Sequence, residues 1–187
     1  MPESPARKAK RLVTERESLV AALRKHGVDY LVPTDAKLEA PIEDEVLLAS
    51  LAAHEDPRLR QALIALFLLH PELSGLVRRA RDRLQGRTAC ELMAFYTAAV
   101  YLQRMWRIRL GQYLPAFIEM PDHFSAELCL PRTEEEHGKV GLHRLAEWHS
   151  TLDLSPRSHL SEYEGVADLL FQSLRLKKRQ DEPAPKR

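Results

Sequence analysis

The sequence is poor in the residues that mark sheets, disulfides and phosphate loops. Only seven of its 187 residues are glycine, two are cysteine, and no Asn-Gly or Asp-Gly pair occurs. The strongest short-range signals for β-hairpins are therefore missing. The glycines are too scattered for a phosphate-binding loop, and neither Cys90 nor Cys129 has a second cysteine nearby for a zinc knuckle or a redox pair.

Long apolar runs and an excess of one charge are lacking as well. The most apolar stretches, Ala62 to Leu69 and Leu92 to Leu102, are shorter than the ~20 residues that a membrane-spanning helix needs. The 28 Lys and Arg residues nearly balance 27 Asp and Glu residues, so any nucleic-acid or membrane affinity must come from a local patch. No apolar segment follows the basic N-terminus, which argues against a secretory signal. We expect a cytoplasmic protein without a membrane partner.

Helical periodicity, interrupted by prolines, fills most of the sequence. Asp56 before Pro57 is typical of a helix N-cap with proline in the first turn, and apolar residues then recur to Leu69. Residues Thr88 to Tyr113 are apolar on nearly every side, which a helix tolerates only when other elements surround it. The sequence predicts an all-α protein, an irregular bundle of about six to seven helices around this central helix.

The predicted helices and their boundaries divide the chain into four parts. We expect helices over residues 4–26, 43–54, 57–69, 74–84, 88–113, 134–152 and 161–178, with Ser74 capping the fourth and Gly86 ending it. The predicted parts are a basic N-terminal helix at 1–27, a linker at 28–41, a single helical domain at 42–176 and a disordered charged tail at 177–187. The linker would allow the first helix to detach from the core.

Two segments resemble known helical proteins. The order of Asp, Arg and small apolar residues from Asp56 to Leu66 resembles the start of a HEAT-type helix. The run from Tyr96 to Leu110 and a short group of residues after it resemble uncharacterised bacterial helical proteins. Those proteins are encoded beside nucleotidyltransferases of the toxin-antitoxin kind. The downstream group is Pro121, Asp122, Phe124, Ser125, Glu127 and Leu128. The second resemblance implies an accessory role beside a partner protein.

Metal-ligand residue types gather most densely between residues 134 and 149. The histidines at 137, 143 and 149 are six residues apart and point roughly 120° from one another on a helix, so they cannot converge on one ion. Glu136, His143 and Glu147 do share a stripe. Glu134 and His137 form the only ExxH unit, whereas a di-iron bundle needs two. We interpret the acids as the solvated first turn of a helix and expect no metal or other cofactor.

Arg132 and His137 suggest one enzymatic hypothesis. Their spacing resembles the Arg-x(4–6)-His pattern of HEPN-type ribonucleases, which implies that the arginine and the histidine bind phosphate and transfer protons on RNA. Pro131 places the pair at the start of a helix rather than within one. A ribonuclease is therefore the third hypothesis, and no catalytic residue is assigned.

Basic clusters are the alternative basis for a function. Two of them are candidate nucleic-acid-binding sites: Arg78, Arg79, Arg81 and Arg83, and Arg104, Arg107 and Arg109. Two further clusters lie near the ends of the chain: Arg7, Lys8, Lys10 and Arg11, and Arg175, Lys177, Lys178 and Arg179. Such clusters can neutralise phosphates in a salt-dependent way, or they can be solvated faces. Pro33 and Pro41 interrupt the place where a helix-turn-helix would need its recognition helix.

The sequence therefore favours recognition over catalysis. The leading hypothesis is a non-catalytic accessory or regulatory module of a bacterial cytoplasmic system that binds another protein. The alternative is sequence-independent nucleic-acid binding through the arginine clusters.

Overall fold

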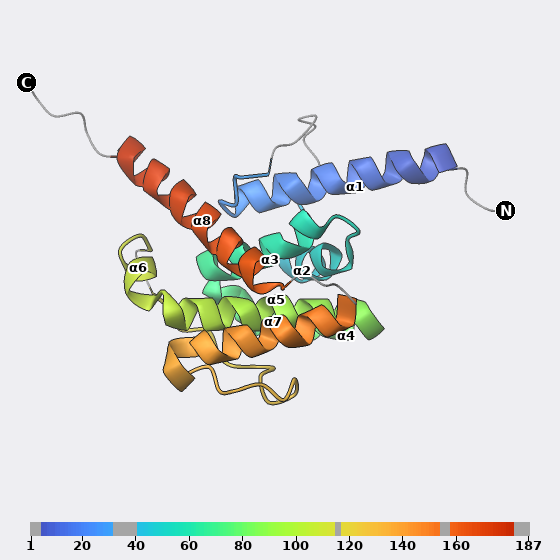
Figure 1. Cartoon of the computed structure of the whole chain (residues 1–187). Helices are drawn as coiled ribbons and strands as arrows, with labels where there is room; N and C mark the ends of the chain where they lie inside the picture. The colour runs from blue at the N-terminus through green and yellow to red at the C-terminus, as the bar shows by residue number, and fades with distance from the viewer. Residues whose placement is uncertain (1–4, 32–40, 115–116, 154–157, 182–187) are drawn as a thin grey trace, which may run out of the picture.

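The computed structural model of the protein is helical throughout the part that it describes, residues 5–31, 41–114, 117–153 and 158–181 (Figure 1). Within these ranges the chain forms eight α-helices and two 3-10 helices and no strand, which confirms the predicted all-α bundle. The elements are α1 (Pro5–Lys25), α2 (Asp44–Ala53), α3 (Pro57–Leu69), η1 (Pro71–Gly75), α4 (Val77–Asp82), α5 (Gly86–Met105), α6 (Arg107–Gly111), η2 (Glu135–Gly138), α7 (Lys139–Asp153) and α8 (Leu160–Asp181). None of the described helices is both long enough and apolar enough to cross a bilayer.

Helix α5 is the centre of the bundle, as its apolar surface predicts. Every residue from Glu91 to Gln103 is buried. Helices α3 and α7 pack most extensively against α5, and α2 and α4 cover more of it. Helix α3 is itself buried from Ala62 to Leu68, and Asp56 caps it by accepting a hydrogen bond from the Arg58 backbone N–H at 2.9 Å.

Helix α1 belongs to the core at its C-terminal end. Leu19, Val20 and Leu23 are buried, and α1 packs against α2 and α3. Figure 1 shows α1 lying across these two helices. Val28 and Leu31, from the predicted linker, are also buried, whereas residues 32–40 lie outside the described part of the chain. The C-terminal part of the first helix therefore packs on the core.

The region before α5 differs from the prediction. The fourth helix divides into η1 and the short α4, because the Ser74 hydroxyl donates to the Pro71 carbonyl within η1 instead of capping a helix. Gly86 does not end that helix but begins α5, with a φ of 52° that glycine adopts without strain.

The predicted single helix over Thr88 to Tyr113 is interrupted at Trp106. Its φ of −108° and ψ of 19° end α5, and α6 starts at the next residue. Neither proline nor glycine lies at this break. The Trp106 ring packs edge-to-face on Phe171 of α8, with 5.9 Å between the ring centroids. A tertiary contact with α8 therefore accompanies the change of direction, which helical periodicity does not reveal.

The predicted helix over 134–152 begins only at Lys139. Glu136 and His137 have φ of 45° and 55°, so the acids lie in the irregular turn η2 and not in the first turn of an α-helix. This turn lies directly against α5, since a β-carbon at Gly138 would lie 2.7 Å from the Tyr101 carbonyl oxygen. At Gly141 a β-carbon would lie 2.1 Å from the Tyr101 ring. The close approach of α7 to α5 therefore requires both glycines.

Helix α8 continues further than the sequence predicts. Residues 177–181, assigned to a disordered tail, are helical, and residues 182–187 lie outside the described residues. The reason is a contact with the end of α1. The Lys177 ammonium donates to the Gly27 carbonyl at 3.1 Å and lies 2.7 Å from the Asp29 carboxylate.

Polar side chains of α5 hold the irregular segment that follows α6. Gln103 donates to the Ile118 carbonyl and accepts from the Met120 backbone N–H, both at 2.9 Å. The Tyr96 hydroxyl donates to the Pro121 carbonyl at 2.6 Å. These bonds fix the segment against α5 and so position the residues around the end of that helix.

Candidate functional site

A cavity of about 710 Å³ lies where α5 ends. Its polar lining consists of Arg104, Arg107, Arg109, Arg175, His137 and Gln112, and its other lining residues are Met105, Trp106, Ile108 and Tyr113. The volume is in the range of known ligand sites, and among the residues that the structure describes no carboxylate lines the cavity. We call it the arginine cavity.

The break at Trp106 explains why these residues meet. Because α6 turns away from the line of α5, its arginines lie beside α8, which supplies Arg175. The turn η2 supplies His137 in a left-handed conformation that residues other than glycine rarely adopt. The contact of Gly138 with Tyr101 holds this turn in place.

Arg109 is held by aromatic rings rather than by a carboxylate. Its guanidinium carbon lies 3.7 Å from the Phe171 ring centroid and 5.4 Å from the Trp106 ring centroid. This is a favourable cation–π arrangement. No carboxylate of the described residues pairs with Arg109 or with Arg175. The cavity therefore contains positive charge that the described part of the protein does not compensate.

Unlike Arg109, the other two arginines from the end of α5 and from α6, Arg104 and Arg107, both pair with a carboxylate, that of Glu119. Their guanidinium nitrogens lie 3.3 and 3.6 Å from its carboxylate oxygens. Arg104 is only 9% exposed and donates to the Met120 carbonyl at 2.8 Å. One carboxylate thus partly neutralises the side of the cavity next to the irregular segment.

The other candidate nucleic-acid-binding cluster, Arg78, Arg79, Arg81 and Arg83, is held by carboxylates and a carbonyl of the protein itself. Arg79 and Arg83 both pair with Glu45 of α2, and Arg81 pairs with Glu127 at 2.9 Å. Arg78 donates to the His123 carbonyl at 3.4 Å. None of the four lines the arginine cavity. Their contacts tie α4 to α2 and to the segment after α6.

The remaining basic clusters have separate environments. The cluster at Arg7, Lys8, Lys10 and Arg11 lies outside the residues whose side chains are described. On α8, Arg175 lines the cavity and the Lys178 ammonium lies 5.7 Å from the Tyr113 ring centroid. The sequence had placed Arg175 in a basic cluster but gave no sign that it lies near Arg109.

The histidines and glutamates of residues 134–149 are dispersed. His137 lines the cavity, whereas Glu136, His143 and Glu147 are exposed, and Glu147 pairs with Arg144 at 3.0 Å. In the part of the chain that the structure describes, no three His, Cys, Asp or Glu side chains are placed to hold a metal ion. Arg132 does not line the cavity with His137.

A buried polar network inside the bundle was not predicted from the sequence. The His149 ring lies 3.1 Å from a Glu91 carboxylate oxygen through Nε2 and 2.6 Å from the Tyr163 hydroxyl through Nδ1. Burial lowers the pKa of His149. Burial acts to raise the pKa of Glu91, but the hydrogen bond and the charges of His149 and Arg60 lower it on balance. Glu91 is therefore an ionised acceptor for Nε2–H, and Nδ1 accepts from Tyr163.

The network connects four helices. The Arg60 guanidinium of α3 lies 3.7 Å from the Glu91 carboxylate. The His159 ring, just before α8, stacks on His149 with 4.0 Å between ring centroids. None of the network residues lines the arginine cavity. Two of its residues gave a signal in the sequence: Glu91, a charged residue directly before the apolar stretch Leu92 to Leu102, and His149, which was considered only as a metal ligand.

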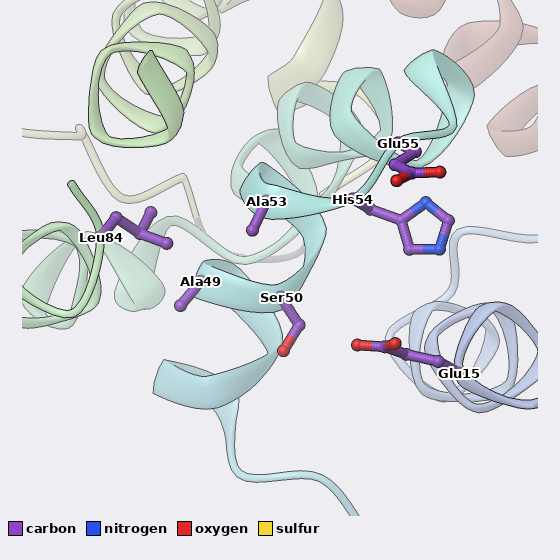
Figure 2. A pocket seen from close by; sticks show the side chains of 7 residues that line it. All are labelled: Glu15, Ala49, Ser50, Ala53, His54, Glu55 and Leu84. Carbon is purple, nitrogen blue, oxygen red and sulfur yellow. The ribbon is translucent and has the colours of Figure 1, made fainter. Parts of the chain in front are cut away.

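A second hollow, of about 330 Å³, lies at the C-terminal end of α2 (Figure 2). Glu15 of α1, Glu55, His54 and Ser50 supply its polar lining. The His54 Nδ1 accepts from the Asp56 backbone N–H at 2.9 Å, which fixes the ring at the end of α2. Figure 2 shows Glu15 across from the His54 ring. This hollow is acidic, in contrast to the arginine cavity.

The arginine cavity is the described site that combines uncompensated charge, apolar surface and room for a ligand. No protein-family model, curated protein or solved structure matches this chain. The function must therefore be inferred from the chemistry of the site itself.

Proposed function

We propose that the protein is a non-catalytic accessory module of a cytoplasmic system, and that it binds a partner protein through the arginine cavity. The observation that carries this proposal is Arg109, stacked on Phe171 and without a carboxylate partner among the described residues. Beside it, Ile108 is 84% exposed. An arginine and a large apolar side chain in a concave site are typical anchors of protein interfaces.

The composition of the cavity supports binding rather than covalent chemistry. Within the described part of the chain, its lining includes one histidine and no serine, cysteine or carboxylate. Nucleophilic catalysis needs a nucleophile next to a base, and general acid–base catalysis usually needs two titratable groups. The HEPN-type hypothesis is favoured only by His137, since Arg132 does not line the cavity.

The second candidate function, nucleic-acid binding, is favoured by the four arginines of the cavity. The aromatic rings support it less. Arg109 lies over Trp106, and Lys178 lies over Tyr113, so cations of the protein already occupy ring faces that bases would need for stacking. An acidic protein surface requires no open ring face.

The test compares two variants that each lose two positive charges. Tagged wild-type protein, Arg109→Gln/Arg175→Gln and the control Arg79→Gln/Arg83→Gln are used to capture proteins from native lysate, with and without nuclease. We expect a specific protein to be lost only with the cavity variant, and to be retained after nuclease treatment. Equal capture by both variants contradicts the proposal. Capture that nuclease abolishes supports nucleic-acid binding instead.

A further inference from the structure

Arg109 and Arg175, the two cavity arginines that no carboxylate of the described residues pairs with, have the chemistry of a carboxylate anchor. Stacking on Phe171 and Trp106 restricts the guanidinium plane of Arg109 without using its N–H donors. A planar guanidinium matches a carboxylate by two parallel hydrogen bonds. Arg175, which is exposed, adds a second positive charge in the same lining.

An apolar contact is available next to these charges. Ile108 is 84% exposed and adjoins Arg109 in α6, and the partly buried Met105 lines the same cavity. A purely ionic ligand would leave Ile108 in water. A ligand that also carries an apolar side chain would remove this surface from water and gain the hydrophobic free energy of burial.

The protein itself contains a segment of this chemistry on the other two arginines of the cavity. Glu119 places its carboxylate on Arg104 and Arg107, at 3.3 and 3.6 Å. Its neighbour Ile118 is 50% exposed. An isoleucine followed by a glutamate is therefore already held at the edge of the cavity, and it occupies two of the four arginines.

We infer that the free half of the cavity binds an acidic, apolar peptide segment of the partner protein. A carboxylate of this segment pairs with Arg109 and Arg175, and the adjacent apolar side chain covers Ile108. This inference rests on the proposed function and specifies the chemistry of the partner.

Synthetic peptides test the inference directly. The probe is a fluorescent 12-residue peptide with repeated Ile-Glu pairs in a Gly-Ser background, titrated by anisotropy with the full-length protein. Matched peptides contain Ile-Gln, Ser-Glu or Ile-phosphoserine instead, and a 12-nucleotide single-stranded RNA is added as a competing class. We expect the Ile-Glu peptide to bind at least about tenfold more tightly than the Ile-Gln peptide, the Ser-Glu peptide and the RNA, because each of these lacks the carboxylate or the apolar side chain. The Ile-phosphoserine peptide offers both an anion and an apolar side chain, and we expect it to bind no more tightly than Ile-Glu.

Protein variants locate the binding. Arg109→Lys keeps the charge but loses the planar fork, so we expect about tenfold weaker binding of the Ile-Glu peptide. Ile108→Ser changes an exposed side chain without disturbing the core and should weaken Ile-Glu to the level of Ser-Glu. The control Arg79→Lys should leave the affinity unchanged. Melting temperatures verify that each variant is folded.

The outcomes separate this inference from the proposed function. Equal binding of Ile-Glu and Ser-Glu overturns the inference, as does tighter binding of the phosphopeptide or the RNA. If none of the peptides binds but protein capture from lysate still depends on Arg109 and Arg175, the inference fails and the proposed function remains. If capture does not depend on them, the proposed function fails.

Discussion

The two arginine-rich regions of the molecule, around α4 and beyond the end of α5, differ in what surrounds them. Around α4, Arg79 and Arg83 share Glu45, which comes from α2. Beyond α5, Arg109 meets the rings of Phe171 and Trp106 and no described carboxylate. Arginines with internal acids fasten elements together, whereas arginines without them retain charge for a ligand.

The buried network differs from both arginine-rich regions because its charged group lies in the protein interior. Glu91 and His149 lie in the interior, where a lost partner costs far more than on the surface because water cannot replace it. The stability of the protein should therefore respond differently when one charged group is removed from the arginines around α4, from the buried network or from the arginine cavity.

The largest effect is expected from Glu91→Ala. It leaves Arg60 and the His149 N–H without their buried acceptor, so the free energy of unfolding should fall by about 3–5 kcal/mol. The control Glu127→Ala removes the 51%-exposed partner of Arg81 and should cost less than about 1 kcal/mol. Urea denaturation measures both, and similar losses would show that the interior network is no more important than a surface pair.

The next effect is a pH dependence that comes from His149. Its pKa in the folded protein is lowered from the ordinary 6.5, so the unfolded chain binds a proton more readily. Stability should therefore fall as pH drops below about 6.5, and fall again below about 4.5, where Glu91 begins to be protonated in the unfolded chain.

The variant His149→Gln isolates this dependence. The difference in unfolding free energy between pH 7.5 and 5.5 should be smaller in the variant than in the wild type. Burial also lowers the pKa of His123, but this residue is present in both proteins, so its contribution cancels. Identical pH profiles of the two proteins would remove His149 as the source.

A smaller loss is expected from Arg109→Ala. The variant loses the stacking of the guanidinium on Phe171, which should cost about 1 kcal/mol, while binding of the partner is lost. Thermal unfolding and the peptide titration together measure the two effects. A variant that binds normally would show that the uncompensated arginine is not the anchor.

The smallest change is expected from Arg79→Ala. Arg79 is 67% exposed, and Glu45 keeps Arg83 as a partner, so stability should change by less than about 0.5 kcal/mol. Partner capture should equal that of the wild type. A strong loss of capture here would erase the distinction between the two arginine regions.

Local signals predicted much of the fold. The Asp56-Pro57 pair set the start of α3, and the apolar surface of α5 placed it at the centre. The break at Trp106 was beyond prediction because it contains no glycine or proline and involves a contact with Phe171, far along the chain. Helical propensity describes neighbours in sequence, and tertiary contacts override it.

The candidate site was only partly predictable for a similar reason. The sequence singled out Arg104, Arg107 and Arg109, and the structure places all three in the cavity. It could not show which arginines remain unpaired, since Glu45, Glu119 and Glu127 reach their partners from distant segments. Compensation of charge is a property of the folded chain, not of a local pattern.

The contact between Gly141 and Tyr101 has a consequence for the buried network. The Tyr101 ring occupies the space where a side chain at position 141 would stand. His149 lies about two helical turns further along α7. A methyl group added at 141 would push the two helices apart and move the imidazole away from the Glu91 carboxylate. The absence of a side chain at position 141 therefore sets the length of a hydrogen bond two turns away.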